Sequence, residues 1–182
     1  MKRQSLEDIN GEIELAFNNA LVAEYANFKE QYPEGVPPAS RRLTNGTIIS
    51  IENKAMRSMS DLHFAVTFHG MQWLHTRQRS LNSGWIELKV LNGVSHDSKF
   101  KLSCYTAGQK RFLREQDSFG SKGWLCIRIN ALMVLMPHNH YELWEGRPIK
   151  KMLTEGLFNG TLKVWDDWPS PKDFYAALTQ EY

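Results

Sequence analysis

The sequence predicts a single α/β domain whose elements follow the order helix, three strands, helix and strand (αβββαβ), with a small C-terminal β-strand and helix appendix. Three observations predict this order: apolar residues at helical spacing near the N-terminus, two segments in which apolar and polar residues alternate, and a nearly continuous apolar stretch at 124–136. A length of 182 residues suits one domain. We therefore assign residues 1–182 to a single domain, with its core at about 5–136 and the appendix at about 137–182.

The first helix is predicted from apolar residues that recur at steps of three and four. They are Leu6, Ile9, Ile13, Phe17, Leu21, Tyr25 and Phe28. Ser5 is a suitable N-cap, and Pro33 stops any continuation of the helix. Because Gly11 weakens the first turns, we expect the firm part of the helix to begin near Glu12.

Two strands are predicted after this helix. Asn45-Gly46 is a turn signal, and residues 47–51 after it favour a strand. Residues 61–69 alternate between apolar and polar side chains, which is typical of a half-buried strand. Residues 70–83 are mostly polar and predict a long connection.

The remaining elements follow the same logic. Residues 85–91 alternate again, with Leu88 facing inward and Glu87 and Lys89 facing outward. Residues 99–104 favour a short strand or an extended loop, and Thr106 is a suitable N-cap for a helix through Gln116. The apolar stretch 124–136 predicts one central strand. The appendix consists of a strand at 161–165 and a short helix from Pro171.

The composition excludes several classes of protein. Hydrophobic residues make up 42% of the chain, which excludes disordered and collagen-like proteins. Two cysteines, Cys104 and Cys126, are too few for a disulfide-stabilised secreted domain and lack the spacing of a zinc site. The first residues are not apolar enough for a signal peptide, and the longest apolar run, 131–136, is too short to cross a bilayer. We therefore expect a soluble cytoplasmic protein without a membrane partner.

The net charge of +2 hides an uneven distribution. Residues 39–125 carry 13 basic and 6 acidic side chains, whereas residues 1–38 carry 3 and 7, and residues 126–182 carry 6 and 7. A basic section between acidic ends is typical of a surface that faces phosphate groups. On charge alone, a solvated surface without a ligand is equally consistent.

Glu87 and Lys89 are the first candidates for a catalytic site. Residues two apart on a strand share one face, so these two side chains project together, and the backbone carbonyl of Leu88 stays available to a metal. Metal-assisted phosphodiester cleavage needs a second carboxylate. Between residues 35 and 86 the chain offers only Glu52 and Asp61. If the strand that begins at Asp61 is the hairpin neighbour of the Glu87 strand, the two carboxylates meet at one metal.

The segment Gly84–Lys89 resembles the acid-x-Lys strand of the PD-(D/E)xK nuclease superfamily, especially of its VRR-type and phage-encoded members related to Holliday-junction resolvases. The helix after Thr106 is similar to the Thr/Ser-x-x-Gln helix that these nucleases place behind that strand, with Gln109 as the glutamine. The αβββαβ restriction-endonuclease-like core of the superfamily matches the predicted order. Ser60 stands where the motif has proline, and the gap between Asp61 and Glu87 is wide.

The resemblance implies a metal-dependent DNA endonuclease that acts on branched or structured DNA in replication or recombination, in the host cytoplasm if it is phage-encoded. It implies Mg²⁺, replaceable by Mn²⁺, held by Asp61, Glu87 and the Leu88 carbonyl. Lys89 would then orient or help to deprotonate the attacking water, and Gln109 would contact a metal-bound water or the phosphate. Some members add a glutamate from the first helix, and Glu24 is the candidate here.

DNA is the partner that the resemblance implies, and basic residues are available to contact it. Lys110, Arg111 and Arg114 on the Gln109 helix, together with Arg77 and Arg79 in the long connection, are candidates for phosphate contacts. Ordinary solubility accounts equally well for any one of these residues. A homodimer would let two sites cut opposing strands of a symmetric junction.

Two alternatives stay open. A nuclease-like fold that binds nucleic acid or a protein partner without cutting has the same sequence signature, because a ligand set can be intact while the metal site is malformed. His138 and His140, with Glu142 and Glu145 nearby, are similar to the His-x-His…Glu metal strand of cupins. No later histidine supplies the last cupin ligand.

Overall fold

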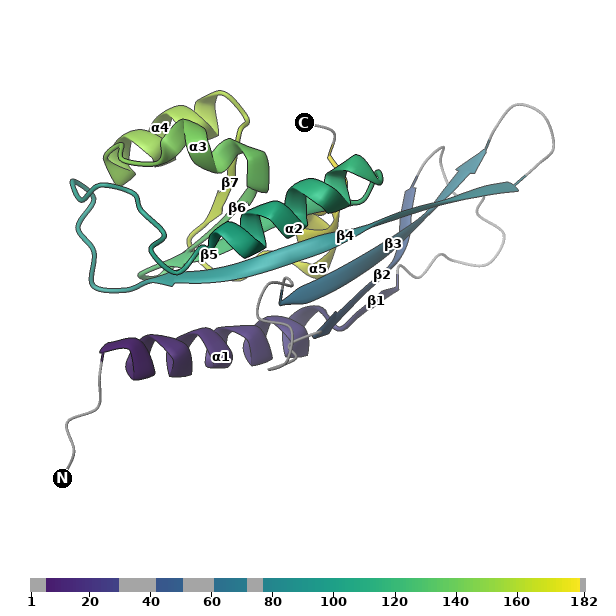
Figure 1. Cartoon of the computed structure of the whole chain (residues 1–182). Coiled ribbons are helices and arrows are strands. Elements are labelled where there is room, and N and C mark those ends of the chain that lie inside the picture. Colours follow the sequence, from purple (N-terminus) through teal and green to yellow (C-terminus); the bar gives the residue numbers. More distant parts are fainter. Residues whose placement is uncertain (1–5, 30–41, 51–60, 72–76, 181–182) are drawn as a thin grey trace.

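The computed structural model describes residues 6–29, 42–50, 61–71 and 77–180, and its architecture is mixed α/β (Figure 1). A curled seven-stranded sheet is built from β1 (Asn27–Lys29), β2 (Arg42–Ser50), β3 (Leu62–Met71), β4 (Arg77–Leu91), β5 (Lys122–Ile129), β6 (Leu132–Pro137) and β7 (Lys163–Trp165). The helices are α1 (Leu6–Tyr25), α2 (Ala107–Ser118), α3 (Tyr141–Trp144), α4 (Ile149–Phe158) and α5 (Pro171–Leu178), and a short 3-10 helix, η1, spans His138–His140. None of the described helices combines the length and apolar composition needed to cross a membrane.

The strands follow chain order across the sheet. Neighbouring strands are antiparallel except β4 and β5, which are parallel and are joined through α2. A parallel pair requires a crossover connection, so α2 is held against the β4–β5 part of the sheet. The pairing of β3 with β4 begins at Leu62 opposite Ile86. Because β4 runs on to Leu91, residues 87–91 of β4 extend beyond the end of β3, and no strand of the described residues pairs with them on that side, which we call the open edge of β4.

Two apolar cores cover the two faces of the sheet. One contains side chains of α1 and α5 and of the inward positions of β2, β3 and β4, including Phe17, Leu88 and Phe174. The other contains side chains of α2, α3 and α4 together with β5 and β6, including Leu113 and Ile127. Figure 1 shows α2, α3 and α4 on one side of the sheet and α1 on the other. Strand β4 therefore has covered faces on both sides at its centre.

The mixed α/β class is confirmed, and the elements α1, β2, β3, β4, α2 and β5 follow the predicted order. The N-cap Thr106 of α2 is also confirmed, and Ser170 caps α5 in the same way, since each side-chain oxygen accepts a hydrogen bond from a backbone N–H of its helix. Residues 99–104 form an extended loop with one isolated bridge, between Lys99 and Pro148. Ser5, Pro33 and residues 51–60 lie outside the described residues.

Several strand boundaries were predicted wrongly. Phe28 belongs to β1 rather than to the first helix, because α1 ends at Tyr25. Asn45 and Gly46 lie inside β2, where the pairing with β3 shifts register between Leu43 and Asn45. The shift lets a strand pass through a dipeptide that usually marks a turn. The predicted long connection 70–83 is mostly strand, since β3 and β4 pair as far as Met71 opposite Arg77.

The apolar stretch 124–136 forms two strands and not one. Asn130 adopts a positive φ of 52°, and β5 and β6 pair as a hairpin from Ile129 opposite Leu132. Asparagine tolerates this left-handed conformation better than most residues, so a tight turn fits inside an otherwise apolar run.

The C-terminal residues are part of the main fold rather than an appendix. Strand β7 extends the same sheet by pairing with β6. Phe174 and Tyr175 of α5 lie in the same apolar core as Phe17 and Tyr25 of α1. The Tyr25 hydroxyl donates to the Pro169 carbonyl at 2.8 Å, which ties the end of α1 to the residues before α5. The chain after residue 137 therefore stabilises the sheet that carries the candidate site.

Candidate active site at the open edge of strand β4

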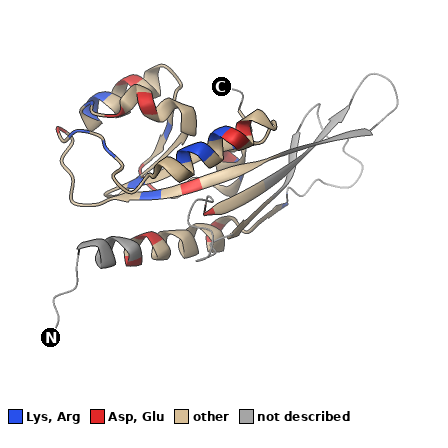
Figure 2. Ribbon diagram, in the orientation of Figure 1, with Lys and Arg blue, Asp and Glu red and all other residues tan. Residues whose placement is uncertain are grey.

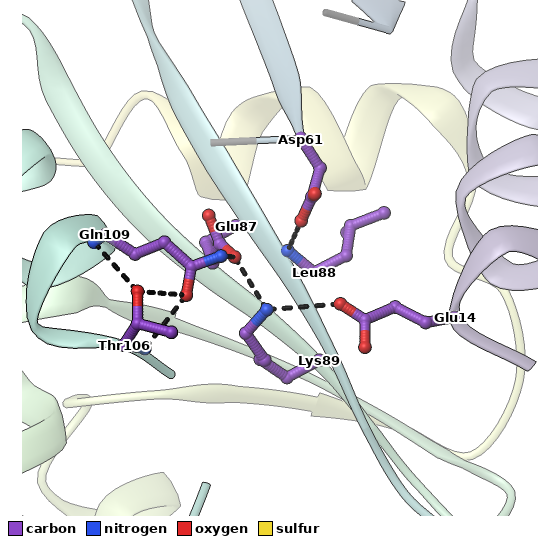
Figure 3. A network of polar contacts seen from close by, with 7 residues as sticks. All are labelled: Glu14, Asp61, Glu87, Leu88, Lys89, Thr106 and Gln109. Carbon is purple, nitrogen blue, oxygen red and sulfur yellow. Dashed lines mark hydrogen bonds and ion pairs between the residues drawn. The ribbon is translucent and has the colours of Figure 1, made fainter. Parts of the chain in front are cut away.

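Asp61 reaches β4 at the point where β3 begins. Its Oδ2 accepts a hydrogen bond of 2.7 Å from the backbone N–H of Leu88 (Figure 3). In an antiparallel pair the N–H and C=O of one residue face the same neighbouring strand. The Leu88 carbonyl therefore faces the open edge on the side where the Asp61 carboxylate lies. The structure thus brings together Asp61 and Leu88, two of the three predicted metal ligands.

Glu87 and Lys89 form a buried ion pair on the face of β4 that α2 covers. Lys89 Nζ lies 2.6 Å from Glu87 Oε1, and the two residues are 2% and 0% exposed. Gln109 Nε2 of α2 donates to the same Glu87 oxygen. The prediction that Glu87 and Lys89 face outward is corrected, because this side of the sheet is packed beneath α2 and the second apolar core. The other Glu87 oxygen, Oε2, is buried and has no hydrogen-bond partner among the described residues.

Gln109 is fixed by the cap of its own helix. Its Oε1 accepts from the Thr106 backbone N–H at 2.9 Å, and the Gln109 backbone N–H donates to Thr106 Oγ1 at 3.2 Å. This reciprocal arrangement is a capping box. Because Oε1 is engaged at the cap, the amide NH₂ is the end that faces Glu87. The Thr-x-x-Gln pattern therefore both starts α2 and aims a donor at the carboxylate.

Glu14 of α1 is a site residue that the sequence analysis missed. Its Oε1 lies 3.1 Å from Lys89 Nζ, so the ammonium group contacts two carboxylates (Figure 3). Glu24, the predicted helix acid, is exposed and lies ten residues further along α1, or about 15 Å at the helical rise per residue. A signal was present in the sequence, since Glu14 lies three and four residues before the buried Phe17 and Asn18. An acid on the buried stripe of a helix indicates an interior partner.

Burial and the neighbouring charges shift the pKa values of Glu87 and Lys89. Burial raises the pKa of Glu87 to about 8, although the nearby Lys89 charge acts in the opposite direction. Burial lowers the pKa of Lys89, but the charges of Glu87 and Glu14 more than offset this and leave its pKa above the ordinary value. Lys89 therefore stays an ammonium group at neutral pH. Its 2.6 Å contact with Glu87 becomes a full ion pair once Glu87 has lost its proton, which happens near the upper end of the physiological pH range.

The residues present fit a magnesium ion in their donor chemistry. Mg²⁺ prefers oxygen ligands, keeps several waters and is usually held by one or two carboxylates. Asp61, Glu87 and the Leu88 carbonyl supply such oxygens, and the unpartnered Glu87 Oε2 is an acceptor that a cation would satisfy. Within the described ranges, no group of three or more His, Cys, Asp and Glu side chains is placed to hold a metal.

The predicted DNA-binding residues divide into two groups. Lys110, Arg111 and Arg114 lie on α2, where Figure 2 shows basic residues along the helix. Arg111 and Arg114 are exposed, and Lys110 is half-buried. Arg77 and Arg79 lie on β4, opposite Met71 and His69 of β3, and their side chains lie outside those described.

The two histidines proposed as cupin-type ligands have separate partners. His138 Nε2 lies 2.6 Å from Asp117 Oδ2, and His140 Nδ1 lies 3.2 Å from the Thr161 carbonyl. Gly123 allows the His138 ring to pack closely, because a Cβ at that position would lie 2.6 Å from the ring. The His138–Asp117 pair thus ties η1 to the C-terminal half of α2, and this geometry offers no common metal position for the two histidines.

Comparisons with protein-family models and with curated proteins found no match for this chain. We therefore infer function from the geometry of the site itself.

Proposed function

We propose that the protein is a Mg²⁺-dependent DNA endonuclease of the PD-(D/E)xK type, with α1, β2–β4, α2 and β5 forming an αβββαβ restriction-endonuclease-like core. The observation that carries the proposal is the buried Glu87–Lys89–Gln109 network, located where Asp61 meets the open edge of β4. Burying an ion pair is costly, and so is leaving a carboxylate oxygen without a partner. Such perturbed groups are found more often at functional sites than elsewhere.

Each residue has a role that follows from its contacts. Asp61, Glu87 and the Leu88 carbonyl would hold the metal. When bound, Mg²⁺ supplies charge stabilisation at the phosphate and lowers the pKa of a water ligand. Lys89 remains protonated, so it orients the water and stabilises developing negative charge rather than accepting a proton. Gln109 holds the Glu87 carboxylate in place.

The basic section of the chain supports a nucleic-acid substrate. Asp61 lies at the start of β3, Glu87 lies on the neighbouring β4, and Gln109 of α2 contacts Glu87; Figure 2 shows basic residues along α2. Branched or structured DNA in replication or recombination is the substrate class that we propose, with a homodimer cutting opposing strands and the cytoplasm, or the host cytoplasm of a phage, as the compartment.

One observation favours a second candidate function, a nuclease-like fold that binds nucleic acid or a protein partner without cutting. Lys89 is ion-paired with both Glu87 and Glu14, which forms a closed network, and the described residues include no group of three side chains placed to hold a metal. A network of this kind can stabilise a fold without a catalytic role.

Cleavage and metal binding distinguish the two candidates. The protein is incubated with Mg²⁺ or Mn²⁺ and a panel of linear, flapped and four-way DNA, and Mn²⁺ affinity is measured separately by titration calorimetry. We expect cleavage that Glu87→Gln and Lys89→Met reduce by at least about a hundredfold, in line with the loss of a group that acts on the transition state. We also expect Glu87→Gln to weaken Mn²⁺ binding.

Matched variants control for charge and stability. Glu115→Gln removes an exposed acid from α2, and Lys101→Met removes an exposed base from a loop, so both should retain cleavage. Circular dichroism verifies that each variant is folded. Cleavage that persists in folded Glu87→Gln and Lys89→Met would refute the site assignment, and DNA binding with neither cleavage nor Mn²⁺ affinity would establish the non-cutting alternative.

A further inference from the structure

A pocket of about 100 Å³ lies between α2 and the η1–α3 segment. Lys110 and Arg114 line it from α2, and Asn139 and Glu142 line it from the other side. The pocket is distinct from the Glu87 network, because Gln109 and Lys110 are consecutive on α2 and project to different sides of the helix. Gln109 contacts β4, whereas Lys110 faces the η1–α3 segment.

Two aromatic rings hold Lys110 at the pocket. Its Nζ lies 4.5 Å from the ring centroid of Tyr141 and 5.4 Å from that of Tyr105, and both rings line the pocket. A cation over aromatic faces is stabilised without a carboxylate. The ammonium group is therefore positioned while its N–H donors remain available to a ligand.

Arg114 is also held without an acidic partner. Its Nε–H donates to the Lys110 carbonyl at 3.3 Å, one helical turn earlier. Within the described part of the chain, neither Lys110 nor Arg114 forms an ion pair with a carboxylate. The Nε–H bond leaves the two terminal NH₂ groups of Arg114 free to form the two-pronged contact that guanidinium groups make with phosphate.

We propose that this pocket binds a phosphate group carried by a nucleotide or by a nucleic-acid strand. Arg114 and Lys110 supply two positive charges, and Asn139 supplies an uncharged amide at the opposite wall. Glu142 is the only acid that lines the pocket, and it lowers the affinity for an anion. The proposal does not depend on cleavage, since no residue of the Glu87 network lines the pocket.

The positions of the basic residues on α2 allow a specific phosphate pocket to be distinguished from general attraction between a basic surface and DNA. Arg111 lies on the same helix and has the same charge, but it is exposed and does not line the pocket. Lys110→Ala, Arg114→Ala and Arg111→Ala each remove one positive charge. If only the overall field attracts nucleic acid, all three variants weaken binding equally.

The test is binding of short, fluorescently labelled single-stranded DNA to the full chain in EDTA, followed by fluorescence anisotropy. We expect Lys110→Ala and Arg114→Ala to weaken binding at least about tenfold, and Arg111→Ala by less than about twofold. Glu142→Gln should tighten binding because it removes the repelling carboxylate. Strands with and without a terminal 5′-phosphate, and a nucleoside monophosphate as competitor, distinguish a terminal phosphate from an internal one.

The outcomes separate this proposal from the nuclease proposal. Equal losses in the three variants, or no effect of Glu142→Gln, would overturn the phosphate pocket even if the protein cleaves DNA. Selective loss in Lys110→Ala and Arg114→Ala would support the pocket even if the protein cleaves nothing. Glu115→Gln removes an exposed acid of α2 that does not line the pocket, so it should leave phosphate binding in EDTA unchanged, and circular dichroism of each variant verifies that it is folded.

Discussion

Among the described glycines whose surroundings the structure gives, Gly84 is the one at which an added methyl group would come closest to the backbone of a neighbouring strand. A Cβ at Gly84 would overlap the backbone carbonyl oxygen of Lys122 and would lie 2.6 and 2.8 Å from two ring carbons of Phe64. Gly84 pairs with Phe64 on β3 and with Lys122 on β5, so its neighbours on both sides are strands. Phe64 is fully buried, and a backbone carbonyl cannot rotate away as a side chain can.

We expect Gly84→Ala to lower the free energy of unfolding by about 3 kcal/mol, the upper end of the usual cost of overpacking, because the Lys122 backbone cannot move aside. In a chain of this length such a loss lowers the melting temperature by roughly 6–12 °C. Urea unfolding followed by circular dichroism measures the free energy, and thermal unfolding measures the temperature. Since Gly84 precedes Glu87 on β4, the same substitution should also displace the candidate site.

Two variants control the interpretation. Gly93→Ala meets no atom within 4 Å but places a side chain at a φ of +68°, so it should cost only about 1 kcal/mol. Phe64→Leu combined with Gly84→Ala relieves the ring contact but not the contact with the Lys122 carbonyl, so the double variant should recover little of the lost free energy of unfolding. An unchanged urea midpoint for Gly84→Ala, or a loss for Gly93→Ala of the same size, would refute the reasoning.

Three further predictions concern the network and the core, and urea unfolding measures each. Burial raises the pKa of Glu87 to about 8, against an ordinary value of 4.5, so the folded protein binds this proton more tightly than the unfolded chain does. The stability gained in this way is fully present below pH 4.5 and is lost as the pH rises towards 8. The Glu87→Gln side chain cannot ionise, so between pH 4.5 and 8 the variant should lose less stability than the wild type, by on the order of 4 kcal/mol. If the free energies of unfolding of the two proteins change in parallel with pH, this prediction is wrong. Thr106→Ala should cost about 1 kcal/mol through loss of the α2 cap, whereas Thr106→Ser should cost much less, and equal losses would rule out the cap as the cause. Tyr25→Phe should cost about 1 kcal/mol with an unchanged denaturant slope, because it removes the buried hydrogen bond to the Pro169 carbonyl; a stability equal to the wild type would show that this bond is not needed.

Local patterns were predictable wherever neighbouring residues decide the structure. Thr106 and Gln109 form the cap of α2 because both groups lie within one helical turn. Glu87 and Lys89 share one face of β4 because side chains alternate along a strand, as predicted, and the structure adds that the two side chains contact each other. Leu62, Phe64, Ile86 and Leu88 are buried as the alternation indicated.

Features that depend on distant segments were not predictable. The stretch 124–136 reads as one apolar strand, and only the left-handed turn at Asn130, which also bonds to the Leu91 carbonyl, divides it into two. The residues after 137 were expected to form an appendix because nothing in their own pattern shows that α5 packs against α1. The place of Glu14 on the buried stripe of its helix indicates an interior partner, but the sequence does not identify that partner, because Lys89 lies 75 positions away in the chain.

The sequence by itself determined the α/β class, the order of the central elements and the face that Glu87 and Lys89 share, because these follow from periodicity and capping over a few residues. The tertiary structure alone decided that this face is buried beneath α2, that β3 begins where Asp61 reaches the Leu88 N–H, and that Glu14 completes the network. The reason is physical: burial and ionisation depend on every segment that packs around a group, and a residue's own neighbours in the chain do not specify those segments.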